Sequence, residues 1–373
     1  MTKRSSRNSS IELLRILSMF AIVIHHYAYH STFKWWVYNT QYLDALKVNL
    51  FLHFFGKLGV DIFVIIGAYF LCEKKFNFRR PINLMLVTIF YSFGIWIFLK
   101  FILQTKLLVP TSLKTILLPF PLPSGYWFVY AYVIMLFAMP FLNIIINSLN
   151  KPKLILLIIG LTFLWSILVV SFNIFSGKPD TSLDNFGYTQ TTFFFLLYFI
   201  AAYVRKYSGK ILNSKKYTAI GAVVGLLLAV VCAYLADSQK LFNDILNTFD
   251  INGPIVIATS VFIFSFFRNC KFDSQMINYI AGSMFGVYLI HEDSFVRPII
   301  WNQLISSKLY VHSGLEYLTA GLIFSLLVFI ICIIIDIVCR RIIFSKVINK
   351  LTVYICTLLI TIEKRTLNDS ETK

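Results

Sequence analysis

The stretch IELLRILSMFAIVIHH, residues 11–26, decides the fold, because it is apolar enough to enter a lipid bilayer and yet contains four ionisable side chains. With the residues up to 29 it reaches the length of about 20 residues that a helix needs to cross a membrane. Lys3, Arg4 and Arg7 precede it, as in a secretory signal peptide, but its ionisable groups and the lack of an A-x-A-like cleavage site argue against removal. We therefore predict a retained first span.

The rest of the chain has the same apolar character. Of its 373 residues, 58% are hydrophobic and 14% are charged, and the mean hydropathy is +0.75. A soluble fold could not bury that much apolar surface. In lipid, every backbone polar group must be paired within the protein, and the apolar runs are continuous, which favours helices over a barrel. We therefore predict an all-α integral membrane protein that crosses the bilayer many times.

Nine further apolar stretches follow the first one. The ten predicted spans are residues 11–29, 50–72, 82–103, 126–147, 153–172, 189–204, 217–236, 251–268, 279–300 and 317–339. A later apolar piece, residues 347–362, contains Lys350 and follows Lys346, so it could lie along the membrane interface. We expect a ten-span membrane domain at 1–341, and an amphipathic or interfacial helix with a basic cytoplasmic tail at 342–373.

Lys and Arg residues set the expected orientation, because positively charged loops stay in the cytoplasm. Alternate loops carry Lys3, Arg4, Arg7, Lys74, Lys75, Arg79, Arg80, Lys151, Lys153, Arg205, Lys206, Lys210, Lys215, Lys216, Arg268 and Lys271. The opposite loops hold Asp44, Asp180, Asp184, Asp237, Asp244, Asp250 and Glu316. We expect a multi-pass protein of the cell membrane with both termini cytoplasmic. The net charge of +17 follows this topology and no nucleic-acid motif accompanies it, so nucleic acid is not an expected partner.

Arg15 and His26 are the first candidates for chemistry, since an ionisable group at membrane depth costs about 2.5–3.5 kcal/mol and marks a functional site by default. Eleven helical positions bring them to within about 20° of one face and about 16 Å apart. Arginine suits phosphate binding and histidine suits proton abstraction. Glu12 could hold the guanidinium, and His25 lies about 100° away from His26. Alternatively, Arg15 and Glu12 only anchor the helix and the histidines only contact other helices.

Two later spans bring further ionisable residues to similar depth. Asp61 could orient His26, or it could pair with Lys57 one turn away on its own helix. In the ninth span, His291 and Glu292 are expected near the same depth, with Arg297 closer to the surface.

Two features at the ends of spans have both a structural and a functional interpretation. Arg79 and Arg80 begin the third span, where they could anchor the helix or capture phosphate from a nucleotide cofactor. Tyr126 and Trp127 begin the fourth span, where they could form part of an interfacial aromatic belt or stack on a sugar ring.

Four segments together resemble the membrane-bound acyltransferase 3 family. They are Glu12-Leu-Leu-Arg15 followed after ten residues by His26, then 59–63 with 67–70, then 126–128, then 286–291. The spacing between the arginine and the histidine is the specific part. The family's usual Asp is Glu12 here, and its common Ser-Gly is Gly67-Ala68. This stand-alone membrane form is similar to members that acetylate capsular, exopolysaccharide or other envelope glycans.

The resemblance implies acetyl-CoA, or another short acyl-CoA, as the donor, with its phosphates near Arg15 and near Arg79 and Arg80. His26 is then the base that deprotonates an acceptor hydroxyl, or the residue that carries the acyl group. Asp61, Glu12 and His291 are expected to assist catalysis. The acceptor, a glycan or lipid-linked saccharide, is expected to meet Tyr126, Trp127 and Glu292.

The alternative from another class is a proton-coupled secondary transporter or a flippase for lipid-linked glycans, because buried His, Asp, Glu and Arg suit a carrier too. Visible repeats and paired broken spans, which carriers often show, are missing from the sequence. The six cysteines form no C-x-x-C pair and no His lies at metal-ligand spacing from them, so no metal is expected. The sequence leaves a homo-oligomer open.

Overall fold

The computed structural model describes residues 8–34, 36, 38–102, 126–176 and 187–371. Within these residues the chain is helical and contains no strand. In this part of the chain, seven helices are long and apolar enough to cross a membrane. These findings confirm a helical, multi-pass membrane protein, whereas the count of ten spans stays a prediction. Lys3, Arg4, Arg7, Asp180 and Asp184, which entered the predicted orientation, lie outside the described residues.

Most predicted spans correspond to single helices or to helices joined end to end. The first five are α1 (Ser9–Tyr29), α2 (Leu43–Leu71), α3 (Arg79–Ile97), α5 (Trp127–Ser148) and the continuous pair α6 (Lys151–Thr162) and α7 (Val169–Ser176), joined by the π-helical turn Phe163–Leu168. The next three are α8 (Gln190–Tyr207), α9 (Lys215–Tyr234) and α11 (Pro254–Asn269). The tenth is α15 (Gly314–Ile335), which continues through the π-helical segment Asp336–Phe344 into α16 (Ser345–Glu371).

The ninth predicted span is not one helix. It is divided into α12 (Gln275–Ala281), α13 (Met284–His291), α14 (Val296–Pro298) and the π-helical turn Ile299–Leu304. The first break falls at Gly282-Ser283, where the backbone N–H groups return to the carbonyls of Tyr279 and Ile280. The second break follows Glu292, which caps the C-terminal end of α13. The sequence also did not indicate α10 (Gln239–Thr248), a short amphipathic helix before α11.

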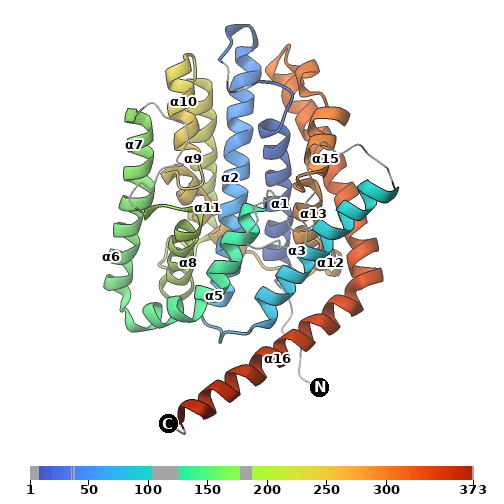
Figure 1. Ribbon diagram of the computed structural model, residues 1–373. Coiled ribbons are helices and arrows are strands. Elements are labelled where there is room, and N and C mark those ends of the chain that lie inside the picture. The colour runs from blue at the N-terminus through green and yellow to red at the C-terminus, as the bar shows by residue number, and fades with distance from the viewer. Residues whose placement is uncertain (1–7, 35, 37, 103–125, 177–186, 372–373) are drawn as a thin grey trace.

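α1 lies inside the bundle, next to α2, α11, α12, α13 and α15 (Figure 1). It packs closely on α2 because Gly56 faces His25 and Gly59 faces the Ser18 carbonyl, where any side chain would collide. Small residues of this kind let membrane helices approach each other. The start of α1 is fixed by Ser10, whose hydroxyl donates to the Phe267 carbonyl at 2.7 Å. α1 is therefore a rigid support for the side chains that it carries.

A buried ion pair holds α13 against α15 and α3. Arg340 donates to both carboxylate oxygens of Asp336, at 2.6 and 2.7 Å, and to the Gly282 carbonyl at 2.8 Å. Tyr91 of α3 donates to the same Asp336 carboxylate at 2.6 Å, and Gly286 of α13 leaves room for it. α16 then leaves the bundle obliquely, at the end where α1 begins (Figure 1).

Candidate active site

His26 and His291 meet between α1 and α13. His26 Nδ1 lies 2.8 Å from His291 Nε2, and His291 Nδ1 lies 2.6 Å from the Val287 carbonyl oxygen. A carbonyl can only accept, so His291 Nδ1 carries the proton, and in the neutral ring its Nε2 is the acceptor. His26 therefore donates from Nδ1, which leaves its Nε2 with a free lone pair. The packing of α13 thus fixes the tautomer of His26 in which Nε2 is a base.

Glu292 supplies the carboxylate of this centre. Its Oε2 lies 3.2 Å from His26 Nδ1 and 3.4 Å from His30 Nε2, and its Oε1 accepts from Arg297 at 2.8 Å. The Glu292 side chain is only 5% exposed. Within the described residues Arg297 donates to its Oε1, whereas Oε2 lies near the two histidine nitrogens without forming a hydrogen bond. A carboxylate in this position stabilises a positive charge on the imidazole ring of His26.

The remaining carboxylate of this segment, Asp293, joins α13 to α5. Tyr126 donates to the Leu289 carbonyl at 2.6 Å and to Asp293 at 3.0 Å, and it is buried. Trp127 is half-buried, and its ring lies 6.2 Å from that of Phe194. Tyr126 thus has its hydroxyl turned into the bundle, whereas Trp127 keeps part of its ring accessible. Their predicted role in sugar binding stays a prediction.

Arg15 lies toward the other end of α1 and contacts a cavity of about 270 Å³. Glu12 accepts from Arg15 at 3.1 Å, as predicted for a carboxylate one turn before it. Tyr132, Phe63 and Gly67 also line the cavity, and the guanidinium of Arg15 lies 6.0 Å from the centre of the Phe63 ring. Among the described residues, Arg15 is the predicted cationic residue that lines this cavity, whereas Arg79 and Arg80 are exposed at the start of α3, one turn before Leu84, which also lines it.

Asp61 is not brought to His26. Gly56 of α2 faces His25 of α1 and Gly59 faces the Ser18 carbonyl, so the antiparallel register places Asp61 level with residues 16–20, roughly 9–15 Å along the helix from His26. Both Asp61 oxygens are buried and have no hydrogen-bond partner in the described part of the chain. The alternative pairing with Lys57 is also not formed, because Lys57 pairs with Asp250 at 2.8 Å. Glu292 occupies the position expected for Asp61.

His30 was not among the residues predicted from the sequence, and Arg297 had no predicted partner. His30 follows His26 by four residues, so the helical spacing already put the two on adjacent turns of one face. Arg297 follows Glu292 by five residues across a break between helices, and no periodic pattern could pair them.

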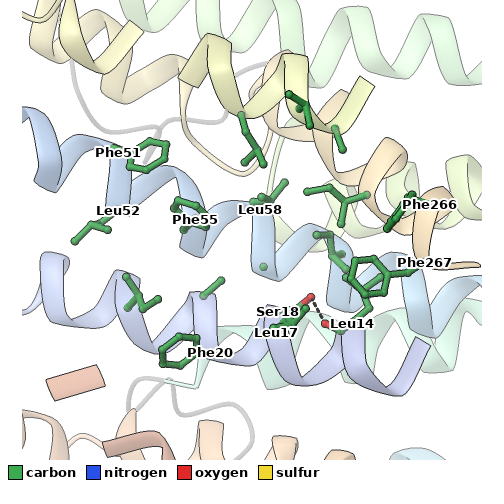
Figure 2. Close-up of a pocket in the computed structure, with 18 of the residues that line it drawn as sticks. Leu14, Leu17, Ser18, Phe20, Phe51, Leu52, Phe55, Leu58, Phe266 and Phe267 are labelled. Atoms are coloured by element: carbon green, nitrogen blue, oxygen red, sulfur yellow. Dashed lines mark hydrogen bonds between the residues drawn. The ribbon is translucent and has the colours of Figure 1, made fainter. Parts of the chain in front are cut away.

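A larger cavity, of about 660 Å³, lies away from these groups on the opposite side of α1, between α1, α2, α9, α11 and α15 (Figure 2). Leu14, Leu17 and Phe20 of α1 line it together with Phe51 and Phe55 of α2. Among the described residues that line it, Ser18 is the only one with a polar side chain, and its hydroxyl is used by the Leu14 carbonyl at 2.8 Å. This cavity has no group for phosphate or a sugar hydroxyl and suits an apolar chain.

The fold and the buried cluster of histidine, glutamate and arginine define a helical membrane protein with ionisable side chains gathered in its interior. Residues 8–337 match the acyltransferase domain of the acyltransferase 3 family, so the chain belongs to that family and is a membrane acyltransferase. No curated protein and no solved structure gives a significant match to it.

Proposed function

We propose that this protein transfers an acetyl or other short acyl group from acyl-CoA to a hydroxyl of a cell-envelope or capsular glycan, with His26 as the base. The observation that carries the proposal is the free Nε2 of His26, which follows from the chain of contacts through His291 to the Val287 carbonyl. A neutral imidazole that is fixed in one tautomer beside a carboxylate is suited to general base catalysis.

In the proposed step, His26 Nε2 takes the proton of the acceptor hydroxyl while the oxygen of that hydroxyl attacks the thioester carbonyl carbon. The C–O bond forms, the C–S bond breaks, and the proton passes from His26 to the departing sulfur, so the products are an ester and free CoA. Glu292 offsets the charge on the ring while His26 holds the proton. In the alternative route, Nε2 attacks the thioester itself and the acyl-histidine then reacts with the hydroxyl.

The donor side of the proposal rests on Arg15 and its cavity. Arg15 and His26 lie eleven residues apart on α1, which is about 16 Å and comparable to an extended pantetheine arm. CoA phosphates at Arg15, Arg79 and Arg80 would let the thioester extend toward His26. The topology that we propose places this end of α1 and both termini in the cytoplasm, with ten spans in the cell membrane.

The test uses purified protein in membranes with labelled acetyl-CoA and a glycan fraction of the envelope. His26→Gln should abolish transfer of label, whereas His25→Gln, which alters the neighbouring ring, should retain most of it. Arg15→Gln should raise the apparent KM for acetyl-CoA with little change in kcat. Retained transfer by folded His26→Gln protein would exclude His26 as the base, and an unchanged KM would exclude Arg15 as a phosphate ligand.

A further inference from the structure

His26, His30 and Glu292 present three potential metal ligands to one point. The two histidines are one turn apart on α1, and Glu292 directly follows α13. Their donor atoms all lie within 4.8 Å of one another. His26 Nδ1 and His30 Nε2 lie 3.2 and 3.4 Å from the same Glu292 oxygen, Oε2.

These distances agree with those of a tetrahedral zinc site. Zinc binds imidazole nitrogen and carboxylate oxygen at about 2.0–2.2 Å, so two ligands of one ion lie roughly 3.3 Å apart. Two imidazoles and a carboxylate also suit zinc better than the hard cations Mg²⁺ and Ca²⁺, which prefer oxygen. Small side-chain rotations would be enough to bring the three ligands onto one ion.

The groups around the cluster are arranged as outer partners of metal ligands. Arg297 binds Oε1 of Glu292 and leaves Oε2 for the metal. His291 Nε2 lies 2.8 Å from His26 Nδ1 with its own Nδ1 held by Val287, so His291 orients the ring of His26 at the edge of the cluster. Hydrogen bonds from metal ligands to backbone carbonyls and charged side chains are usual in such sites.

We propose that this cluster binds one Zn²⁺ ion and that the bound ion reversibly inhibits the acyl transfer proposed above, on which the inhibitory part rests. Zinc takes the lone pair of His26 Nδ1, so the remaining ring proton must sit on Nε2. His26 Nε2 is then a donor and can no longer accept the proton of a hydroxyl. The N–H bond at Nδ1 breaks, its proton leaves to solvent, and Nε2 takes a proton from solvent, so the ion inverts the tautomer that the contact with His291 imposes.

Direct binding is measured first, on the full chain in detergent micelles. Zn²⁺ is titrated by calorimetry, and Co²⁺ replaces it as a probe whose visible absorption identifies tetrahedral coordination. Wild type should bind one equivalent. His30→Gln should bind at least tenfold more weakly. His312→Gln, which changes an exposed histidine outside the cluster, should bind like wild type. Absent binding, or equal affinity in His30→Gln, would overturn the metal site.

Inhibition is measured separately on the same three proteins. Wild type and His312→Gln should lose acyl transfer as Zn²⁺ is added and regain it with a chelator. The rate of His30→Gln in Zn²⁺ is compared with its own zinc-free rate, and the variant should lose most of its sensitivity to Zn²⁺. Equal inhibition of all three proteins would overturn the proposal. If no protein transfers acyl groups, the proposed function fails while the Co²⁺ spectrum still decides the metal site.

Discussion

Glu292 is the carboxylate that contacts His26, and it is removed from water by Arg297 and His30. Replacing it with glutamine keeps the size and removes the charge that stabilises a protonated His26. We expect Glu292→Gln to lower kcat on the order of 10²–10⁴-fold with little change in the KM for acyl-CoA. Steady-state acetyl transfer checks this.

The matched control for Glu292→Gln is Glu73→Gln, which removes the carboxylate of an exposed pair with Arg205 at 2.7 Å. An exposed ion pair contributes about 0–1 kcal/mol, so the control should keep both its folding and its rate. A wild-type kcat in Glu292→Gln would show that His26 does not carry a positive charge during the reaction.

Asp61 is the second residue-scale case, because both its oxygens are buried without a partner. Asparagine has nearly the same shape and no charge to desolvate. We expect Asp61→Asn to raise the free energy of unfolding by about 1–3 kcal/mol, read as a higher Tm in detergent. A lower Tm would contradict the conclusion that the Asp61 carboxylate has no hydrogen-bond partner among the described residues. Loss of transfer in a more stable variant would give Asp61 a role in activity that its position away from His26 does not explain.

Positions within one helix were predictable from the sequence, and the position of one helix relative to another was not. Apolar length and helical spacing placed Arg15 and His26 at two ends of one stripe on α1. The same arithmetic brought Asp61 and Glu292 near His26 in depth, but only the register of α1 and α2 shows that Asp61 lies elsewhere. Which carboxylate faces the imidazole depends on packing between distant segments, which one sequence does not specify.

At the scale of elements, the close contact of α1 and α2 is the feature that positions His26. A Cβ at Gly56 would overlap the side chain of His25, so Gly56→Ala must separate the helices. We expect a loss of about 1–3 kcal/mol in stability and a lower transfer rate. Gly94→Ala in α3 is the control, since no atom lies within 4 Å of its Cβ, and it should be neutral or stabilising by about 0.5–1 kcal/mol. Equal thermal unfolding of the two variants would contradict this packing.

Helices with continuous apolar sequence were predictable, and broken ones were not. Hydropathy indicates α1, α2 and α5 because one long run needs one long helix. It joins α12 and α13 into a single span because Gly282-Ser283 interrupts the backbone without making the sequence polar. The break is stabilised by Arg341, which donates to the Tyr279 carbonyl at 2.7 Å. Arg341 lies 62 residues further along the chain, so the sequence around the break does not indicate this contact.

The whole molecule separates two groups of ionisable residues along α1. Arg15 and its cavity lie near the end where α1 begins and α16 leaves the bundle, and the histidine and glutamate centre lies near the other end. Apolar residues occupy most of α1 between them. An acyl group that travels from one centre to the other crosses part of the membrane, so the two substrates should reach the protein from opposite sides.

This separation predicts a sided reaction. The test uses sealed vesicles that hold the protein in one orientation, with acetyl-CoA that cannot cross the membrane. Acetyl-CoA on the side where α1 begins should support transfer at a rate at least tenfold higher than acetyl-CoA on the opposite side. An epitope at the C-terminus, tested for protease access, independently identifies the side where α1 begins, and detergent permeabilisation should restore transfer from both sides. The distance between Arg15 and His26 requires this result, since a donor entering beside His26 would leave its phosphates far from Arg15, Arg79 and Arg80. Full activity with acetyl-CoA on the His26 side would therefore exclude the Arg15 cavity as the donor site.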